Sequence, residues 1–336
     1  MGRIEYLDAI KGFAIILVVI GHVIAWNVND LEIIVHPMSL YDIRIGQIWN
    51  IIYSFHMALF FMVSGFLVSL QGKSSKSFLK KKANRLLLPY VTTGFIILVA
   101  RGHYGYWYFL SLFELCVTLL LIDFVGKSLH FSDNALKEML LCFFFWGVLF
   151  IIHKKFSLET SVGDFGKFIN YYPAFMLGYL MRKYNLIFEK LVGQKFYSGY
   201  LIAFIFLLVL HYSYLMPFLP KLISKLAINI SGIIIQIIGS LLIFQVFSQM
   251  PPKKNILNRL SKIGFYSMDI YIFHILFVFT IPLMEKYMIN NLSFTSYTCG
   301  QIVYSSVFAS LAIIMSIAMG KMIRKSNILK QLILGN

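Results

Sequence analysis

A few ionisable residues lie within apolar stretches of the sequence, where such side chains are costly and are therefore candidates for function. His22 follows Lys11 by eleven residues, so on a helix the two side chains point about 20° apart and lie about 16 Å apart along the axis. Asp8 lies on the same face, and Gly12 and Gly21 allow close approach of a neighbour or substrate. His22 lies deepest in the apolar stretch and is the strongest of these candidates for a functional role.

A second histidine, His56, is expected at a similar depth to His22 on the next apolar segment, where the two can share a polar cavity. Structural interpretations stay open beside a functional role. His22 can be a core histidine bonded to a neighbouring helix, His56 can be bonded to an interfacial loop, and Asp8 and Lys11 can anchor their helix at the membrane surface.

A basic run precedes the third apolar segment. Lys82 and Arg85 are three residues apart, so on a helix they share a face and can clamp an anionic group such as a phosphate. The same run is also typical of a positively charged cytoplasmic loop that anchors the chain in the membrane. The sequence leaves both interpretations open.

Other ionisable groups are predicted inside the apolar segments. Glu114 is an acid within such a segment and needs a lysine or histidine partner. Tyr271 and His274 share one face of a predicted helix and form a polar stripe. Asp269 points away from that stripe, towards Lys262, and we interpret it as the partner of that lysine on the same helix.

The composition sets the class of protein that must position these groups. Of 336 residues, 59% are hydrophobic and only 13% are charged, whereas about 25% are charged in an ordinary soluble domain. This excludes a soluble globular domain, a disordered chain and a disulfide scaffold. The net charge of +16 then indicates basic cytoplasmic loops rather than a nucleic-acid partner. The three cysteines show no metal or redox spacing, and no metal-binding or nucleotide-binding motif is present.

The hydrophobic pattern predicts an all-α, polytopic membrane protein of about ten transmembrane helices. With the N-terminus in the cytoplasm, 22 of the 30 Lys and Arg residues lie on the cytoplasmic side, and the C-terminus is cytoplasmic as well. We expect residues 1–336 to form one transmembrane domain with no separate soluble domain. The expected spans are residues 9–28, 48–70, 86–100, 105–125, 136–152, 165–181, 196–214, 226–248, 264–283 and 298–320.

At these residues the chain resembles the acyltransferase 3 family of integral membrane carbohydrate O-acyltransferases. Residues 6–12 with His22 are similar to a family motif in which a basic residue precedes a histidine by ten intervening positions. Lys11 and Lys82 stand where arginine is usual. Lysine keeps the positive charge but lacks the planar guanidinium group, which can bind a phosphate through two hydrogen bonds at once. Ala58 stands where proline is frequent. Further matching segments, in family order across most of the chain, are residues 55–66, 82–90, 107–110, 173–179 and 267–274.

The resemblance implies transfer of an acyl group, most often acetyl, from cytosolic acyl-CoA to a hydroxyl group of a cell-surface or lipid-linked carbohydrate. Acetyl-CoA is then a donor substrate, and no permanently bound cofactor is implied. The acceptor is a polysaccharide, lipid-linked sugar or glycolipid. The protein is expected as a multi-pass protein of the bacterial cytoplasmic (inner) membrane, surrounded by the lipid bilayer.

Within this scheme Lys11, Lys82 and Arg85 bind the donor, and His22 is the general base or forms an acyl-histidine. His56 donates a hydrogen bond to the oxyanion or acceptor. We expect supporting roles for Asp8, which orients Lys11, and for Glu114, Tyr271 and His274. The outer loops 29–47 and 153–167 are candidates for contact with the acceptor.

Two other classes of function remain open. In a multi-pass transporter of a small substrate or modified glycan, the intramembrane residues His22, His56, Glu114, Asp269 and His274 form a proton relay or substrate path. Such proteins often have repeated halves with interrupted helices, and the sequence shows no such symmetry. A non-catalytic membrane partner in an envelope assembly is the third possibility. Binding of coenzyme A separates the enzyme from both.

Overall fold

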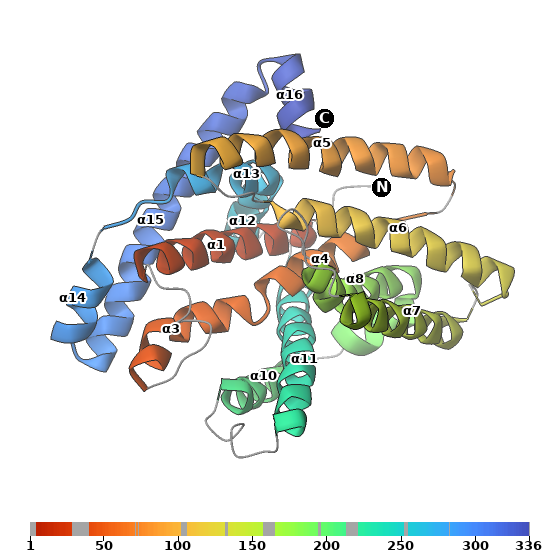
Figure 1. Ribbon diagram of the computed structural model, residues 1–336, viewed down its shortest axis with the longest axis horizontal. Coiled ribbons are helices and arrows are strands. Elements are labelled where there is room, and N and C mark those ends of the chain that lie inside the picture. Colours follow the sequence, from red (N-terminus) through yellow and green to blue (C-terminus); the bar gives the residue numbers. More distant parts are fainter. Residues whose placement is uncertain are drawn as a thin grey trace. The chain divides into compact units, whose positions relative to one another are not determined.

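A computed structural model of the 336-residue chain describes all residues except 1–4, 29–39, 71, 73, 102–105, 132–133, 157–164, 194–195, 213–220, 252–254, 282 and 336. Every regular element in the described part is a helix, as predicted (Figure 1). The helices are α1 (Glu5–Val28), α3 (Leu40–Tyr53), α4 (His56–Phe66), α5 (Ser75–Arg101), α6 (Trp107–Ser128), α7 (Ala135–Phe156), α8 (Phe165–Lys183), α9 (Asn185–Phe188), the π-helix η1 (Glu189–Gly193), α10 (Tyr197–Tyr212), α11 (Lys221–Ser248), α12 (Asn255–Phe265), α13 (Ser267–Phe277), α14 (Met284–Asn291), α15 (Phe294–Ile323) and α16 (Asn327–Leu334).

Six of the described helical segments are long and apolar enough to cross a membrane, against about ten predicted spans. Residues 185–193 and 197–211 add a seventh span if that bent pair counts as one. The six are Glu5–Val28, Ile45–Phe66, Trp107–Ser128, Ala135–Phe156, Ile228–Ser248 and Phe294–Ile323. The count of ten and the orientation of the termini therefore stay predictions.

Two predicted spans are interrupted. Residues 48–70 break at Ser54 and Phe55, between α3 and α4, although Ile45–Phe66 together remain long and apolar enough to cross a membrane. Residues 264–283 are interrupted at Tyr266, and the helix that follows, α13, ends at Phe277 after 11 residues. That length covers roughly 16 Å, well short of a hydrocarbon core of about 30 Å. Lys262 and Asp269 consequently lie on different helices, so our interpretation of them as partners on one helix is wrong.

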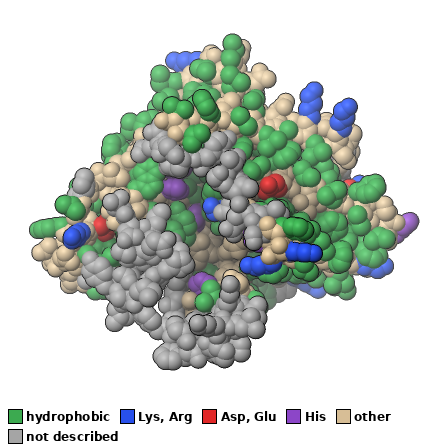
Figure 2. Space-filling model, viewed as in Figure 1, with side chains coloured by type: hydrophobic (Ala, Val, Ile, Leu, Met, Phe, Trp, Pro, Cys, Tyr) green, Lys and Arg blue, Asp and Glu red, His purple; other side chains and the backbone are tan. Residues whose placement is uncertain are grey.

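The chain divides into two compact units. The first unit comprises Met1–Leu59 and Phe196–Met322, and the second comprises Phe60–Lys195 and Ile323–Asn336. Large apolar side chains are exposed in both, for example Phe206 on α10 and Phe144 on α7. Hydrophobic side chains also cover much of the face shown in Figure 2. Such a surface is expected of helices that contact lipid.

The first unit is built around α1, which packs most closely against α12 and also contacts α3, α11 and α13. Two glycines allow the tight contact between α1 and α12. A Cβ atom on Gly12 would lie 2.0 Å from the carbonyl oxygen of Leu260, and one on Gly264 would lie 1.8 Å from that of Asp8. The two backbones are thus in direct contact, as in other membrane helix pairs that meet through small residues.

The second unit has a similar close contact through two glycines, where α4 crosses α8. A Cβ atom on Gly65 would lie 2.0 Å from the carbonyl oxygen of Phe175, and one on Gly178 would lie 2.0 Å from that of Met62. Around this crossing α5 packs on α6, α6 contacts α7 and α8, and α7 packs on α8. The close crossing brings the aromatic rings of Phe61 and Tyr171 into a stack with centroids 5.0 Å apart.

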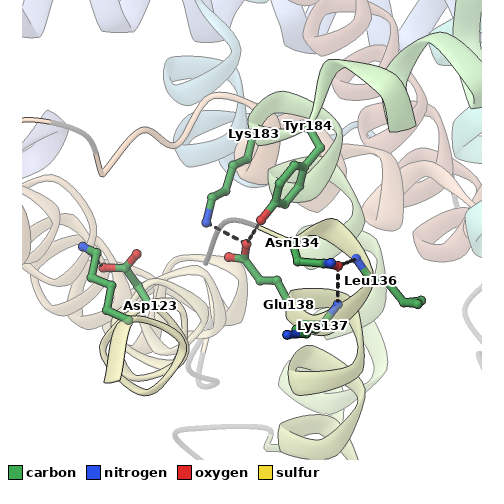
Figure 3. A network of polar contacts seen from close by, with 8 residues as sticks. Asp123, Asn134, Leu136, Lys137, Glu138, Lys183 and Tyr184 are labelled. Atoms are coloured by element: carbon green, nitrogen blue, oxygen red, sulfur yellow. Dashed lines mark hydrogen bonds and ion pairs between the residues drawn. The ribbon is translucent and has the colours of Figure 1, made fainter. Parts of the chain in front are cut away.

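A buried ion pair connects α7 to the end of α8 (Figure 3). Glu138, in the first turn of α7, is 2% exposed. Its Oε2 accepts hydrogen bonds from Lys183 Nζ at 2.6 Å and from the Tyr184 hydroxyl at 2.5 Å. A nearby but exposed pair joins Asp123 to Lys127 within α6, at 2.6 Å.

We expect Glu138→Gln to destabilise the protein by about 2 kcal/mol, because it removes the charge partner of a partly buried lysine and weakens a buried hydrogen bond. Asp123→Asn is the matched control, since it breaks an exposed pair worth less than about 1 kcal/mol. Thermal unfolding in detergent should show the larger fall in Tm for Glu138→Gln. Equal shifts in the two variants would contradict the structural role of the buried pair.

Candidate active site

The first unit brings a second imidazole next to His22. His22 lies on α1 and is half-buried. Its ring centroid is 5.1 Å from that of His274 on α13, with the ring planes 78° apart. His22 also interacts electrostatically with His56, the first residue of α4. The structure therefore gathers three of the predicted site residues, His22, His56 and His274, into one histidine cluster.

The hydrogen bonds of two of these histidines fix a proton on Nδ1 of each ring. His56 Nδ1 lies 2.8 Å from the carbonyl oxygen of Ile52, and His274 Nδ1 lies 2.8 Å from that of Ile270. A carbonyl oxygen only accepts, so each Nδ1 carries the proton and each neutral ring presents an accepting Nε2. His56 can thus donate from Nε2, as the sequence-based role requires, only when it is a cation. Within the described residues, Nε2 of His274 is buried and has no hydrogen-bond partner.

Aromatic side chains of α3 form the wall beside this cluster. Tyr53 lies with its ring centroid 4.5 Å from that of His56 and stacks on Trp49 at 3.8 Å. Gly21 of α1 faces the same ring, because a Cβ atom there would lie 2.6 Å from Cε2 of Tyr53. The close approach that the sequence predicted at Gly21 is therefore made by an aromatic ring of the protein itself. Sequence reasoning did not identify Tyr53 or Trp49.

Asn27 fixes α1 relative to the segment that follows α13, and the sequence reasoning missed it too. Its side-chain amide donates to the carbonyl oxygen of Phe279 at 3.1 Å, and its Oδ1 accepts from the backbone N–H of Ile281 at 2.8 Å. These bonds satisfy backbone groups left without helical partners after α13 ends. A polar residue near the end of an apolar helix is a sequence signal that can point to such an anchor.

Tyr271, the remaining predicted residue of α13, has its ring centroid 6.3 Å from that of His274. Asp269 at the start of α13 is fully buried and packs against α15, where a Cβ atom on Gly320 would lie 2.6 Å from its carboxylate. α13 thus carries both a member of the histidine cluster and a buried acid that holds the helix against α15.

Lys11 and Asp8 form an ion pair at the beginning of α1. Lys11 Nζ lies 2.6 Å from Asp8 Oδ1, and the lysine side chain is 26% exposed. The spacing of three residues places both side chains on one face of the helix. The carboxylate thereby limits the directions that the ammonium group can take, on the helix that also carries His22.

Lys82 and Arg85 lie in the second unit, on the first half of α5. Lys82 is half-buried, with Nζ 5.5 Å from the ring centroid of Phe78, and Arg85 is exposed. The two cations interact electrostatically with Cys116 and Tyr108 of α6. The Tyr108 hydroxyl also lies 2.9 Å from the Ser64 hydroxyl. The three predicted donor-binding cations are therefore divided between the units, because Lys11 belongs to the first.

Two further acids, Glu114 and Glu285, are at least partly buried. Glu114 is half-buried on α6, and its carboxylate has no hydrogen bond or ion pair within the described part of the chain. Glu285 of α14, which sequence reasoning missed, is buried and accepts hydrogen bonds from Tyr297 at 2.6 Å, from Gln301 at 3.1 Å and from Tyr304. Burial raises the pKa of the Glu285 carboxyl, and the bonds from Tyr297 and Gln301 partly oppose this rise.

Some predicted features lie outside the described residues. Most of loop 29–47 and residues 157–164 of loop 153–167, both candidates for contact with the acceptor, belong to those parts. Among the residues that are described, no group of three or more His, Cys, Asp or Glu side chains is placed to hold a metal ion.

The helices and the histidine cluster define a multi-pass membrane protein with a buried site suited to proton transfer. A family model described as an acyltransferase domain matches residues 4–320. The chain belongs to this acyltransferase 3 family, which confirms the resemblance seen in its motifs. Neither the curated proteins nor the solved structures contain a match to this chain. Family membership identifies a membrane acyltransferase that takes an acyl donor and an acceptor.

Proposed function

We propose that the protein is an O-acyltransferase of the cytoplasmic membrane. It transfers an acyl group, acetyl in the simplest case, from cytosolic acyl-CoA to a hydroxyl group of a cell-surface or lipid-linked carbohydrate. The observation that carries this proposal is the histidine cluster around His22 in a chain of the acyltransferase 3 family. A half-buried imidazole beside the imidazole of His274 is suited to accept a proton from a poorly nucleophilic alcohol.

In the proposed reaction the neutral imidazole of His22 takes the proton of the sugar hydroxyl as its oxygen attacks the thioester carbonyl. The tetrahedral intermediate collapses with cleavage of the carbon–sulfur bond. The His22 imidazolium returns the proton to the departing sulfur, so the products are the ester and free coenzyme A. In an alternative order, His22 first attacks the thioester carbonyl and coenzyme A leaves as a thiolate. The acyl-histidine then passes its acyl group to the sugar oxygen, and the hydroxyl proton neutralises the thiolate.

His274 supports His22 in this scheme. The Nε2 atom of His274 is buried beside His22 and can accept a hydrogen bond from one ring nitrogen of His22. This bond would orient the other ring nitrogen of His22, with its lone pair, towards the sugar. His56, in its protonated form, donates to the oxyanion. The donor carries several phosphate charges, which favours Lys11, Lys82 and Arg85 as its binding groups. The ion pair with Asp8 keeps Lys11 ordered.

The first test uses a strain that lacks the gene, complemented with the wild-type protein or with an empty vector. We expect base-labile acetyl groups on envelope glycans only when the protein is present, and loss of acetyl from acetyl-CoA in its membranes. Unchanged glycans, with no acetyl-CoA consumption by purified protein, would contradict an acetyl-CoA-dependent enzyme and favour the transporter or partner alternatives.

A further inference from the structure

The last described helix, α16, lies beyond the residues matched by the family model and packs against α5, which carries Lys82 and Arg85 (Figure 1). Both helices belong to the second unit. α16 begins after Ser326, whose hydroxyl accepts the N–H of Leu329, and it ends at Gly335. Leu334 is completely buried, so α16 is attached by side-chain packing as well as by polar contacts.

α5 lacks one backbone hydrogen bond close to Lys82 and Arg85. Pro89 lies inside the helix and has no N–H, so the carbonyl group of Arg85 lacks its usual partner four residues later. A proline at such a position commonly kinks a helix. Nevertheless α5 runs without interruption from Ser75 to Arg101.

α16 contacts α5 on both sides of Pro89. On one side the Thr92 hydroxyl donates a hydrogen bond to the carbonyl oxygen of Leu332 at 2.6 Å. On the other side Gly335 lies against the backbone, since a Cβ atom there would be 2.5 Å from the carbonyl oxygen of Asn84 and 2.7 Å from Cα of Arg85. Gly335 also has a φ of +65°, which glycine adopts without strain.

We propose that α16 is a splint, a helix that holds the two halves of α5 in one fixed direction across Pro89 and so sets the direction in which Lys82 and Arg85 meet the phosphate groups of the donor. A bend at Pro89 would swing the half of α5 that carries both cations. The splint itself follows from the contacts between α5 and α16, whereas its effect on the donor rests on the function proposed above. In this role α16 is a positioning element for the basic pair.

Hydrogen exchange of the purified full-length protein tests the splint without reference to the substrate. We compare Gly335→Ala and a chain ended after Lys325 with Gly72→Ala. Gly72 has a φ of +67° and no neighbour within 4 Å, so its replacement brings similar backbone strain without touching α5. We expect faster exchange in residues 82–93 for both α16 variants and wild-type exchange for Gly72→Ala. Unchanged exchange in both α16 variants would overturn the splint.

Calorimetry with acetyl-CoA on the same proteins tests the effect on the donor. We expect Kd to rise about tenfold, equivalent to about 1.4 kcal/mol, for the α16 variants. Arg85→Ala should also raise Kd but should leave exchange in α5 unchanged. Faster exchange with an unaltered Kd would overturn the role in donor binding. If the wild-type protein itself does not bind acetyl-CoA, the proposed donor is wrong, and the exchange comparison still decides whether α16 is a splint.

Discussion

Replacing His22 with alanine is expected to abolish acyl transfer while the protein remains folded and inserted in the membrane. A positioned general base contributes about 10²- to 10⁴-fold to a rate, and an acyl-histidine route would lose its nucleophile altogether. The half-buried His22 packs edge-on against His274 and Trp26. Alanine removes these contacts without adding volume. The measurement is base-labile acetyl on envelope glycans after complementation, with membrane levels of both proteins confirmed to be equal.

His211→Ala is the matched control for His22→Ala. His211 is a histidine of the same unit, on α10, and its Nδ1 lies 2.8 Å from the Ser231 hydroxyl. We expect this variant to retain acetylation within about threefold of wild type, since His211 bonds to Ser231 of α11 and the proposed reaction assigns it no step. Wild-type acetylation by His22→Ala would show that the catalytic base lies elsewhere.

The second large effect is expected from Gly178→Val, which should prevent the second unit from folding. The valine Cβ would occupy a point 2.0 Å from the carbonyl oxygen of Met62 and 3.0 Å from the backbone nitrogen of Phe66. Neither atom belongs to a flexible side chain, so α4 and α8 must separate. Overpacking of this kind costs at least about 3 kcal/mol, a large share of the stability of an ordinary domain.

Gly147→Val distinguishes this clash from the general effect of valine in a helix. Gly147 lies in the interior of α7, where a Cβ atom would have no neighbour within 4 Å. Size-exclusion chromatography of detergent extracts should show a monodisperse peak for Gly147→Val and little or none for Gly178→Val. Equal yields of folded protein would mean that α4 and α8 do not cross as closely as the structure shows.

Features carried by single segments of the chain were predictable. Runs of apolar residues indicated the helices, because a helix must cover the bilayer core with consecutive apolar side chains. The positions of Asp8 and Lys11 followed from helical periodicity, and the two residues are indeed in contact. Gly12 was recognised as a point of close approach. Its neighbour, the backbone of α12, was not predictable because Gly12 and Gly264 lie far apart in the sequence.

The interruption at Tyr266 shows where sequence reasoning failed. Residues 264–283 are apolar enough to suggest one helix, yet α13 ends at Phe277, and Asn27 of α1 bonds to the backbone at Phe279 and Ile281. A hydropathy pattern records the preference of each residue for an apolar environment. It does not record a backbone hydrogen bond to a side chain more than 250 positions away.

The sequence by itself determined the helical membrane class and the family, and it singled out His22 as a candidate, because hydropathy, periodicity and short motifs are properties of contiguous residues. The tertiary structure alone decided that His274 lies beside His22, that Glu138 pairs with Lys183, and that α16 crosses α5 at Pro89. These contacts join residues distant in the chain. They depend on how helices pack, and many packings are compatible with the same one-dimensional pattern of apolar and polar residues.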